Sequence, residues 1–120
     1  MSGAPAPQPA AEQAAPRLVF WEATAGCNLA CRHCRRLEVS AALSTRDLTT
    51  VQAKAHLLDA LAAVAAVGRP ILVFSGGEPL MRPDLFELAD HARQRGLPIA
   101  LATNGTLVDD ATADRIVAAG

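Results

Sequence analysis

The chain has 120 residues, of which 51% are hydrophobic and 3% aromatic, and its formal net charge at pH 7 is −1. This length suits a single domain, whose core must be packed mainly by alanine and leucine because aromatic side chains are scarce. A charge so close to zero gives no reason to expect a nucleic-acid partner or a membrane surface, and no apolar run is long enough to span a bilayer.

Residues 1–16 are rich in alanine, proline and glutamine, a composition typical of a disordered tail. They lack the basic start and the apolar centre of a signal peptide. All three cysteines of the chain lie in one short motif, which argues against a disulfide framework. We therefore expect a cytoplasmic protein with a disordered tail over 1–16 and a folded domain over 17–120.

Three apolar stretches rich in strand-forming residues are predicted to be β-strands, at 17–24, 70–74 and 98–103. The second is an unbroken apolar run, as expected of a parallel strand that is covered on both faces. The cysteine motif follows the first strand, and residues 35–46 are predicted to be a loop that can include a short helical turn.

A helix is predicted between the first and second strands. Thr49 and Gln52 fit a capping box at its start, and Gly68 followed by Pro70 is a stop signal. Its apolar face, at helical spacing, comprises Val51, Ala55, Leu58, Leu61, Ala62 and Ala65. The pattern indicates one amphipathic helix packed on the sheet.

Two further helices are predicted, one after each of the other strands. Pro83 suits the first position of the earlier helix, which ends before Gly96 and Pro98. Asp109 can cap the later helix, and Gly120 suits its C-cap. The inward positions are Leu85, Leu88, Ala89 and Ala92 in the earlier helix, and Ala113, Ile116 and Val117 in the later one.

The order of elements is therefore βαβαβα, with helices long enough for right-handed crossovers between parallel strands. We predict an α/β fold with a parallel sheet. Three polar stretches, at 27–34, 75–79 and 103–105, each follow a predicted strand. Because chemistry in such folds gathers at the carboxyl ends of the strands, the three stretches are expected to meet on one side of the sheet.

The first of these stretches contains Cys27, Cys31 and Cys34, spaced C-x-x-x-C-x-x-C. Three thiolates in one loop are a metal-ligand arrangement, since soft sulfur selects iron–sulfur clusters, zinc or copper. A closed cubane cluster or a structural zinc site normally takes four protein ligands, so three leave a position open. The alternatives are a structural zinc site, for which no histidine is suitably spaced, and three unligated thiols.

The second stretch begins with Gly76 and Gly77. Glycine lets a ligand approach backbone groups without a Cβ in the way. The alternative is a tight turn between strand and helix that leaves Glu78 exposed.

The cysteine motif, followed by FSGGEP at 74–79 and ATNG at 102–105, resembles the radical S-adenosylmethionine (SAM) enzymes. In that family three cysteines hold three irons of a [4Fe–4S] cluster, and the fourth iron is chelated by the amino and carboxylate groups of SAM. One electron from the reduced cluster cleaves SAM to methionine and a 5′-deoxyadenosyl radical, which abstracts hydrogen from a substrate. The resemblance implies that Cys27, Cys31 and Cys34 are the metal ligands, and that a reductant such as ferredoxin or flavodoxin is a partner.

The resemblance also implies which residues contact SAM. Glu78 is expected close to the SAM amino group, and His33 stands where many members carry an aromatic ring against the adenine. As alternatives, His33 is a solvent-facing loop residue, and Thr103 and Asn104 are plain turn formers. The full set of expected SAM contacts is Gly76, Gly77, Glu78, Pro79, His33, Thr103 and Asn104. No catalytic residue is expected beyond the cluster ligands.

The family's fold is a partial (β/α)6 barrel similar to a TIM barrel, and residues 17–120 provide three βα units. We therefore expect the (βα)3 portion that forms the N-terminal half of a radical SAM core, in a chain that is a fragment. The surroundings of Trp21 and the sequence CRHCR at 31–35 are similar to the branch with haem and haem d1 biosynthesis enzymes, PQQ-type peptide modifiers and SPASM-containing proteins.

Within that branch, a tetrapyrrole is the first expected substrate and a peptide the second. The expectation from a different class of function is a non-catalytic iron–sulfur or zinc-binding module without turnover.

Overall fold

The structure, a computed structural model, describes residues 3–6, 16–34, 41–64 and 68–120. Most of the tail that the sequence predicts over 1–16 lies outside the described residues. Within the described ranges, no helix is long and apolar enough to cross a membrane.

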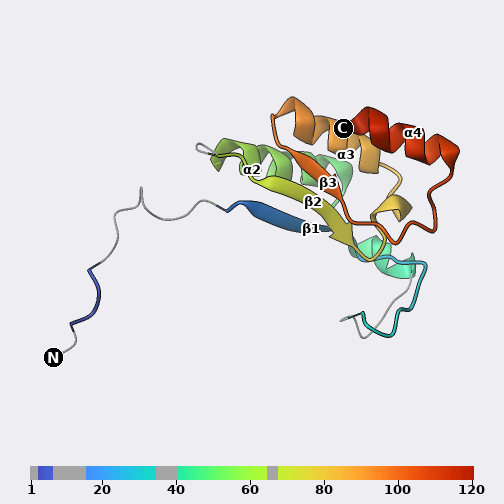
Figure 1. Ribbon diagram of the computed structural model, residues 1–120, viewed down its shortest axis with the longest axis horizontal. Helices are drawn as coiled ribbons and strands as arrows, with labels where there is room; N and C mark the ends of the chain where they lie inside the picture. The colour runs from blue at the N-terminus through green and yellow to red at the C-terminus, as the bar shows by residue number, and fades with distance from the viewer. Residues whose placement is uncertain (1–2, 7–15, 35–40, 65–67) are drawn as a thin grey trace.

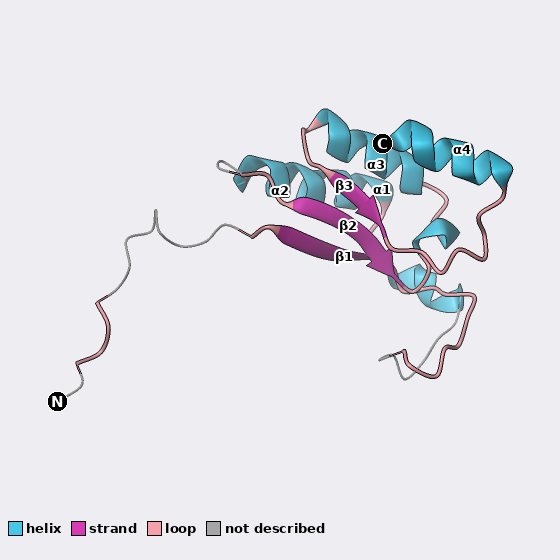
Figure 2. Cartoon of the chain, in the orientation of Figure 1, coloured by secondary structure: helices cyan, strands magenta, loops and turns pink. Residues whose placement is uncertain are grey.

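Three strands form one parallel sheet in the order β1-β2-β3 (Figures 1 and 2). They are β1 (Leu18–Thr24), β2 (Ile71–Gly76) and β3 (Ile99–Leu101). The register is irregular between Glu22 and Thr24 of β1, directly before the cysteine motif. The predicted α/β class with a parallel sheet is confirmed, although β3 is shorter than the predicted strand.

The first helical region comprises α1 (Thr50–Gln52), a π-helical segment η3 (Ala53–Leu58) and α2 (Asp59–Val64). The capping box is present: the Gln52 backbone N–H donates to Thr49 Oγ1 at 3.2 Å, and the Thr49 N–H donates to Gln52 Oε1 at 2.9 Å. This confirms the predicted start of the helix.

The predicted apolar face of this helix is wrong at its beginning. Val51 is 75% exposed and Ala55 is also exposed, whereas Ala53 and Leu58 are fully buried. A π-helix bonds each N–H to the carbonyl five residues earlier, as Asp59 does to Lys54. Residues five apart therefore share a face here, which a 3.6-residue period misses. Ala65 of the predicted face lies outside the described residues.

The later helices are α3 (Leu85–Gln94) and α4 (Asp110–Ala119), and two short 3-10 helices, η2 (Ala41–Arg46) and η4 (Pro79–Met81), lie in connecting segments. The predicted buried positions of α3 are confirmed. Pro83 is not its first residue, because a turn in which the Leu85 N–H donates to the Arg82 carbonyl precedes the helix.

The start and the end of α4 agree with the prediction. Asp109 caps the helix by accepting the Thr112 N–H at 2.7 Å, and Gly120, with a φ of 76°, is the C-cap. Val117, however, is 80% exposed, while Ile116 is half-buried. Adjacent residues on an α-helix point about 100° apart, and here α4 turns Ile116 toward the core and Val117 toward solvent.

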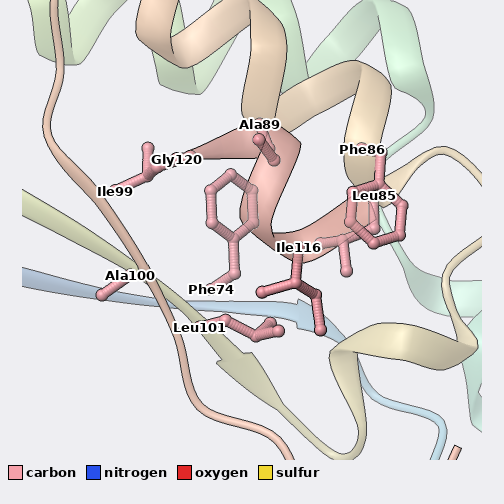
Figure 3. A pocket seen from close by; sticks show the side chains of 10 residues that line it. Phe74, Leu85, Phe86, Ala89, Ile99, Ala100, Leu101, Ile116 and Gly120 are labelled. Carbon is pink, nitrogen blue, oxygen red and sulfur yellow. The ribbon is translucent and has the colours of Figure 1, made fainter. Parts of the chain in front are cut away.

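The helices α2, α3 and α4 lie over one face of the sheet (Figure 1). The core between the two layers includes Leu72 and Phe74 of β2 and Leu88 of α3, and the Trp21 and Phe74 rings are 5.6 Å apart. The expectation that β2 is covered on both faces holds only in part, since Ile71 is 42% exposed. Near β3, an apolar cavity of about 290 Å³ lies between the sheet edge, α3 and α4, with Phe74 and Ile116 pointing into it (Figure 3).

Candidate functional site

The loops that follow the three strands meet at the carboxyl end of the sheet, as the sequence predicts. They line a cavity of about 160 Å³. Its walls are Cys27, Leu29, Cys31, His33, Cys34, Gly76, Gly77 and Asn104. All three cysteines therefore share one cavity with the glycine pair at the end of β2 and with the turn after β3.

The thiols of this cavity are accessible. Cys27 is half-buried, Cys31 and Cys34 are exposed, and none of the three forms a disulfide. The Cys34 N–H donates to the Cys31 carbonyl at 3.1 Å, and this turn connects the second and third cysteines. As a donor set, three sulfurs suit an iron–sulfur cluster. Among the described residues, no three His, Cys, Asp or Glu side chains are grouped tightly enough to hold a metal ion.

Position 76 requires a glycine because the backbone there lies directly against β1. Its φ is +126°, and a Cβ at this position would lie 2.3 Å from the Thr24 carbonyl oxygen. The next two backbone N–H groups donate to the same region: Gly77 to the Thr24 carbonyl at 2.9 Å and Glu78 to the Gly26 carbonyl at 2.8 Å. The glycine pair is thus fixed against the chain that leads into the cysteine motif.

The Glu78 side chain is completely buried and does not line the cavity. Its Oε1 accepts hydrogen bonds from Thr103 Oγ1 at 2.7 Å and from the Asn104 N–H at 2.6 Å. Its Oε2 accepts the Leu80 N–H at 2.7 Å. The carboxylate therefore joins the end of β2 to the end of β3, and the alternative of an exposed glutamate in a turn is wrong.

The structure divides the expected SAM contacts into two groups. His33, Gly76, Gly77 and Asn104 line the cavity, and the His33 ring is exposed. Glu78, Pro79 and Thr103 do not line it, and both Glu78 and Pro79 are buried.

Sequence reasoning missed Asn28, which connects two of the loops. Its Oδ1 accepts from Asn104 Nδ2 at 3.0 Å, and its Nδ2 donates to Thr106 Oγ1 at 2.8 Å. Thr106 in turn donates its N–H and its hydroxyl to Asn104 Oδ1, at 3.0 and 2.8 Å. In the sequence, the only indication of this role is that an amide side chain lies between Cys27 and Cys31.

Two more residues that the sequence reasoning missed, Arg82 and Asp84, form an ion pair behind the site, with Arg82 Nε 2.7 Å from Asp84 Oδ1. Burial raises the pKa of Asp84, but hydrogen bonds from Arg82 and Thr50 outweigh this and hold the pKa below its usual value of 3.8. Asp84 is therefore ionised at neutral pH and balances the charge of Arg82, which is only 6% exposed.

The sequence model of the radical SAM superfamily matches residues 21–120. An AdoMet-dependent heme synthase of Methanosarcina barkeri is 51% identical over 106 residues, which are 88% of this chain and 29% of that protein. A pre-heme d1 synthase of Dinoroseobacter shibae is 42% identical over 86% of this chain and 24% of its own length.

A mycofactocin maturase of Mycobacterium tuberculosis is 36% identical over 87% of this chain and 25% of its own length. The chain thus spans only 24% to 29% of the length of these three relatives. The match to the superfamily covers nearly all of the sheet and its helices, and the relatives are similar over the same region. The chain therefore belongs to the radical SAM superfamily.

Proposed function

We propose that this chain is part of a radical SAM enzyme in which Cys27, Cys31 and Cys34 ligate three irons of a [4Fe–4S] cluster. The single observation that supports this most directly is that the three thiols line one cavity with Gly76 and Gly77. When bound, the reduced cluster supplies the electron for reductive cleavage of SAM to a 5′-deoxyadenosyl radical.

The residues around the cavity would bind and orient SAM. Gly76 and Gly77 carry no side chain that could obstruct a ligand at the cavity wall. Asn104, held by Asn28, Thr106 and Glu78, would form a fixed part of the cavity wall, and the exposed His33 ring could stack on the adenine. Glu78, Pro79 and Thr103 would act from behind the cavity, by fixing the backbone that the ligand contacts.

The domain assignment is part of the same proposal. In it, residues 17–120 belong to the N-terminal half of a radical SAM core, whereas most of the tail expected over 1–16 lies outside the described residues. A reductant of the ferredoxin or flavodoxin kind, a cytoplasmic location, and the lack of a nucleic-acid or membrane partner also remain proposals.

For the substrate, we propose a tetrapyrrole. The supporting observation is that relatives named AdoMet-dependent heme synthase and pre-heme d1 synthase are 51% and 42% identical to this chain. Modification of a peptide is the second candidate, supported by the mycofactocin maturase at 36% identity.

The experiment that tests the proposed function is anaerobic reconstitution with iron and sulfide, followed by electron paramagnetic resonance of the reduced protein with and without SAM. We expect a [4Fe–4S]⁺ signal that changes when SAM is added, because the open iron would take SAM as a ligand. Cys31→Ser is the matched control and should lose the signal.

Two outcomes contradict the proposal. A cluster whose spectrum is indifferent to SAM supports the alternative of a non-catalytic iron–sulfur module. A chain that takes up zinc but no cluster supports a zinc-binding module.

A further inference from the structure

The segment that carries the three cysteines, residues 25–47, is held at its base. Residues 35–40 of it lie outside the described part of the chain, but both of its ends are described. At the base, Asp47 Oδ1 accepts the Ala25 N–H at 2.7 Å. The first and the last residues of the segment are therefore joined by a direct hydrogen bond.

Arg82 makes a second connection just outside this one. Its Nη1 donates to the Ala23 carbonyl at 2.7 Å, and its Nη2 donates to the Leu48 carbonyl at 2.6 Å. These two carbonyls flank the cysteine segment, one on each side. A guanidinium can bridge them because its N–H donors are arranged in a rigid planar fork.

The guanidinium is itself fixed from other directions. Asp84 accepts from Arg82 Nε at 2.7 Å and from Nη2 at 3.1 Å, and Thr50 Oγ1 donates to the same carboxylate at 2.5 Å. The Trp21 ring centroid is 5.3 Å from the guanidinium carbon. A buried charge with a bidentate partner, two carbonyl acceptors and an aromatic neighbour has little freedom to move.

Fixing these ends bears on metal binding, because Cys27, Cys31 and Cys34 all lie in the segment between them. Ligation must hold Cys27, Cys31 and Cys34 in one arrangement, and this restriction costs conformational entropy. The cost is smaller when the two ends of the segment are already held together.

We propose that Arg82 and Asp47 are positioning residues that hold the ends of the cysteine segment and so determine how firmly the three thiolates retain iron. This inference rests on the proposed function, since it requires a cluster on the cysteines. Arg82 would act through two backbone carbonyls at once, which a lysine ammonium, as a single point charge, cannot reproduce.

The test measures the rate at which a chelator removes iron from the anaerobically reconstituted chain. We expect Arg82→Lys and Asp47→Ala to lose iron about three- to tenfold faster than the wild type, as the loss of one hydrogen bond of ordinary strength implies. Asp47→Asn keeps an acceptor oxygen for the Ala25 N–H and should behave like the wild type. Arg95→Lys is the control for Arg82→Lys, because Arg95 is exposed and pairs with Asp59 on another part of the molecule.

Circular dichroism of each variant shows whether it is folded. Folded Arg82→Lys and Asp47→Ala proteins that release iron at the wild-type rate overturn the inference. If Arg82→Lys does not fold, the Asp47 pair decides, and equal rates for Asp47→Ala and Asp47→Asn overturn it. A wild-type chain that assembles no cluster overturns the proposed function and the inference with it, so the two failures are distinguishable.

Discussion

Glu78 shows how a residue of the site motif can act without touching a ligand. It is fully buried, and both carboxylate oxygens are occupied by groups of the chain itself. The sequence suggests proximity to the SAM amino group, and that contact stays a prediction. The structure assigns Glu78 a role that is independent of SAM, which is to join the loops after β2 and β3.

This arrangement predicts that Glu78→Ala lowers the stability of the fold, whether the chain binds SAM or only holds a metal. The substitution leaves the Leu80 and Asn104 N–H groups and the Thr103 hydroxyl without their acceptor, and the loss of each of these three part-buried hydrogen bonds costs about 0.5–1.5 kcal/mol. We expect the free energy of unfolding, measured with urea, to fall by at least about 2 kcal/mol. Glu87→Ala is the control, because Glu87 is 58% exposed and its ion pair with Lys54 contributes little.

An unfolding free energy for Glu78→Ala within the error of the wild type would show that the buried carboxylate is not needed to hold the loops. SAM titration of the same variant then reports on the ligand separately. A loss of SAM affinity at unchanged iron content is the expected result if Glu78 also positions the SAM contacts.

The helical region between β1 and β2 buries a different face from the one that a regular α-helix would bury, and two substitutions distinguish these faces. Ala53 is fully buried in the π-helical segment, whereas Ala55, which the 3.6-residue period places inside, is exposed. We expect Ala53→Leu to destabilise the fold by about 1–3 kcal/mol, because extra methylenes must enter a packed core. Ala55→Leu should change the stability by less than about 0.5 kcal/mol, as is usual on a surface.

Thermal unfolding followed by circular dichroism measures both substitutions. The opposite order, with Ala55→Leu the more damaging, would restore the regular α-helical face and contradict the π-helical one. Because leucine forms helices well, the comparison is not confounded by helix propensity.

These elements also show how far the sequence could predict the structure. The alternation of strands and helices, the helix caps and the meeting of three loops followed from local patterns, because strand composition, the Thr49–Gln52 box and the Asp109 cap act over a few residues. The π-helical phase did not, since it depends on packing against the sheet. The contacts of Arg82 with Ala23 and Leu48 join residues far apart in the sequence, and no local pattern indicates them.

The whole molecule has one apolar sheet face that no helix of the described part covers. Leu18 and Phe20 of β1 are 48% and 64% exposed, and Ile71 of β2 is 42% exposed. Leu18 pairs with Ile71 in the sheet, and Phe20 pairs with Val73, so these side chains lie side by side. Strands alternate their side chains between faces, which puts this group opposite the core residues Leu72 and Phe74.

Contiguous apolar surface of this kind promotes association, since each Phe, Leu or Ile side chain that leaves water completely gains about 1.5–3 kcal/mol. We therefore expect the isolated chain to self-associate as its concentration rises, with a mean mass above the 12.5 kDa of the monomer.

Phe20→Glu should return the mass toward the monomer, because a carboxylate at the centre of the face would have to be desolvated on contact. Val117→Glu is the control. Val117 is 80% exposed on α4, which lies on the helix-covered side of the sheet, so its substitution should leave association unchanged. Sedimentation velocity over a concentration series measures all three proteins, and a wild-type chain that stays monomeric throughout would contradict the prediction.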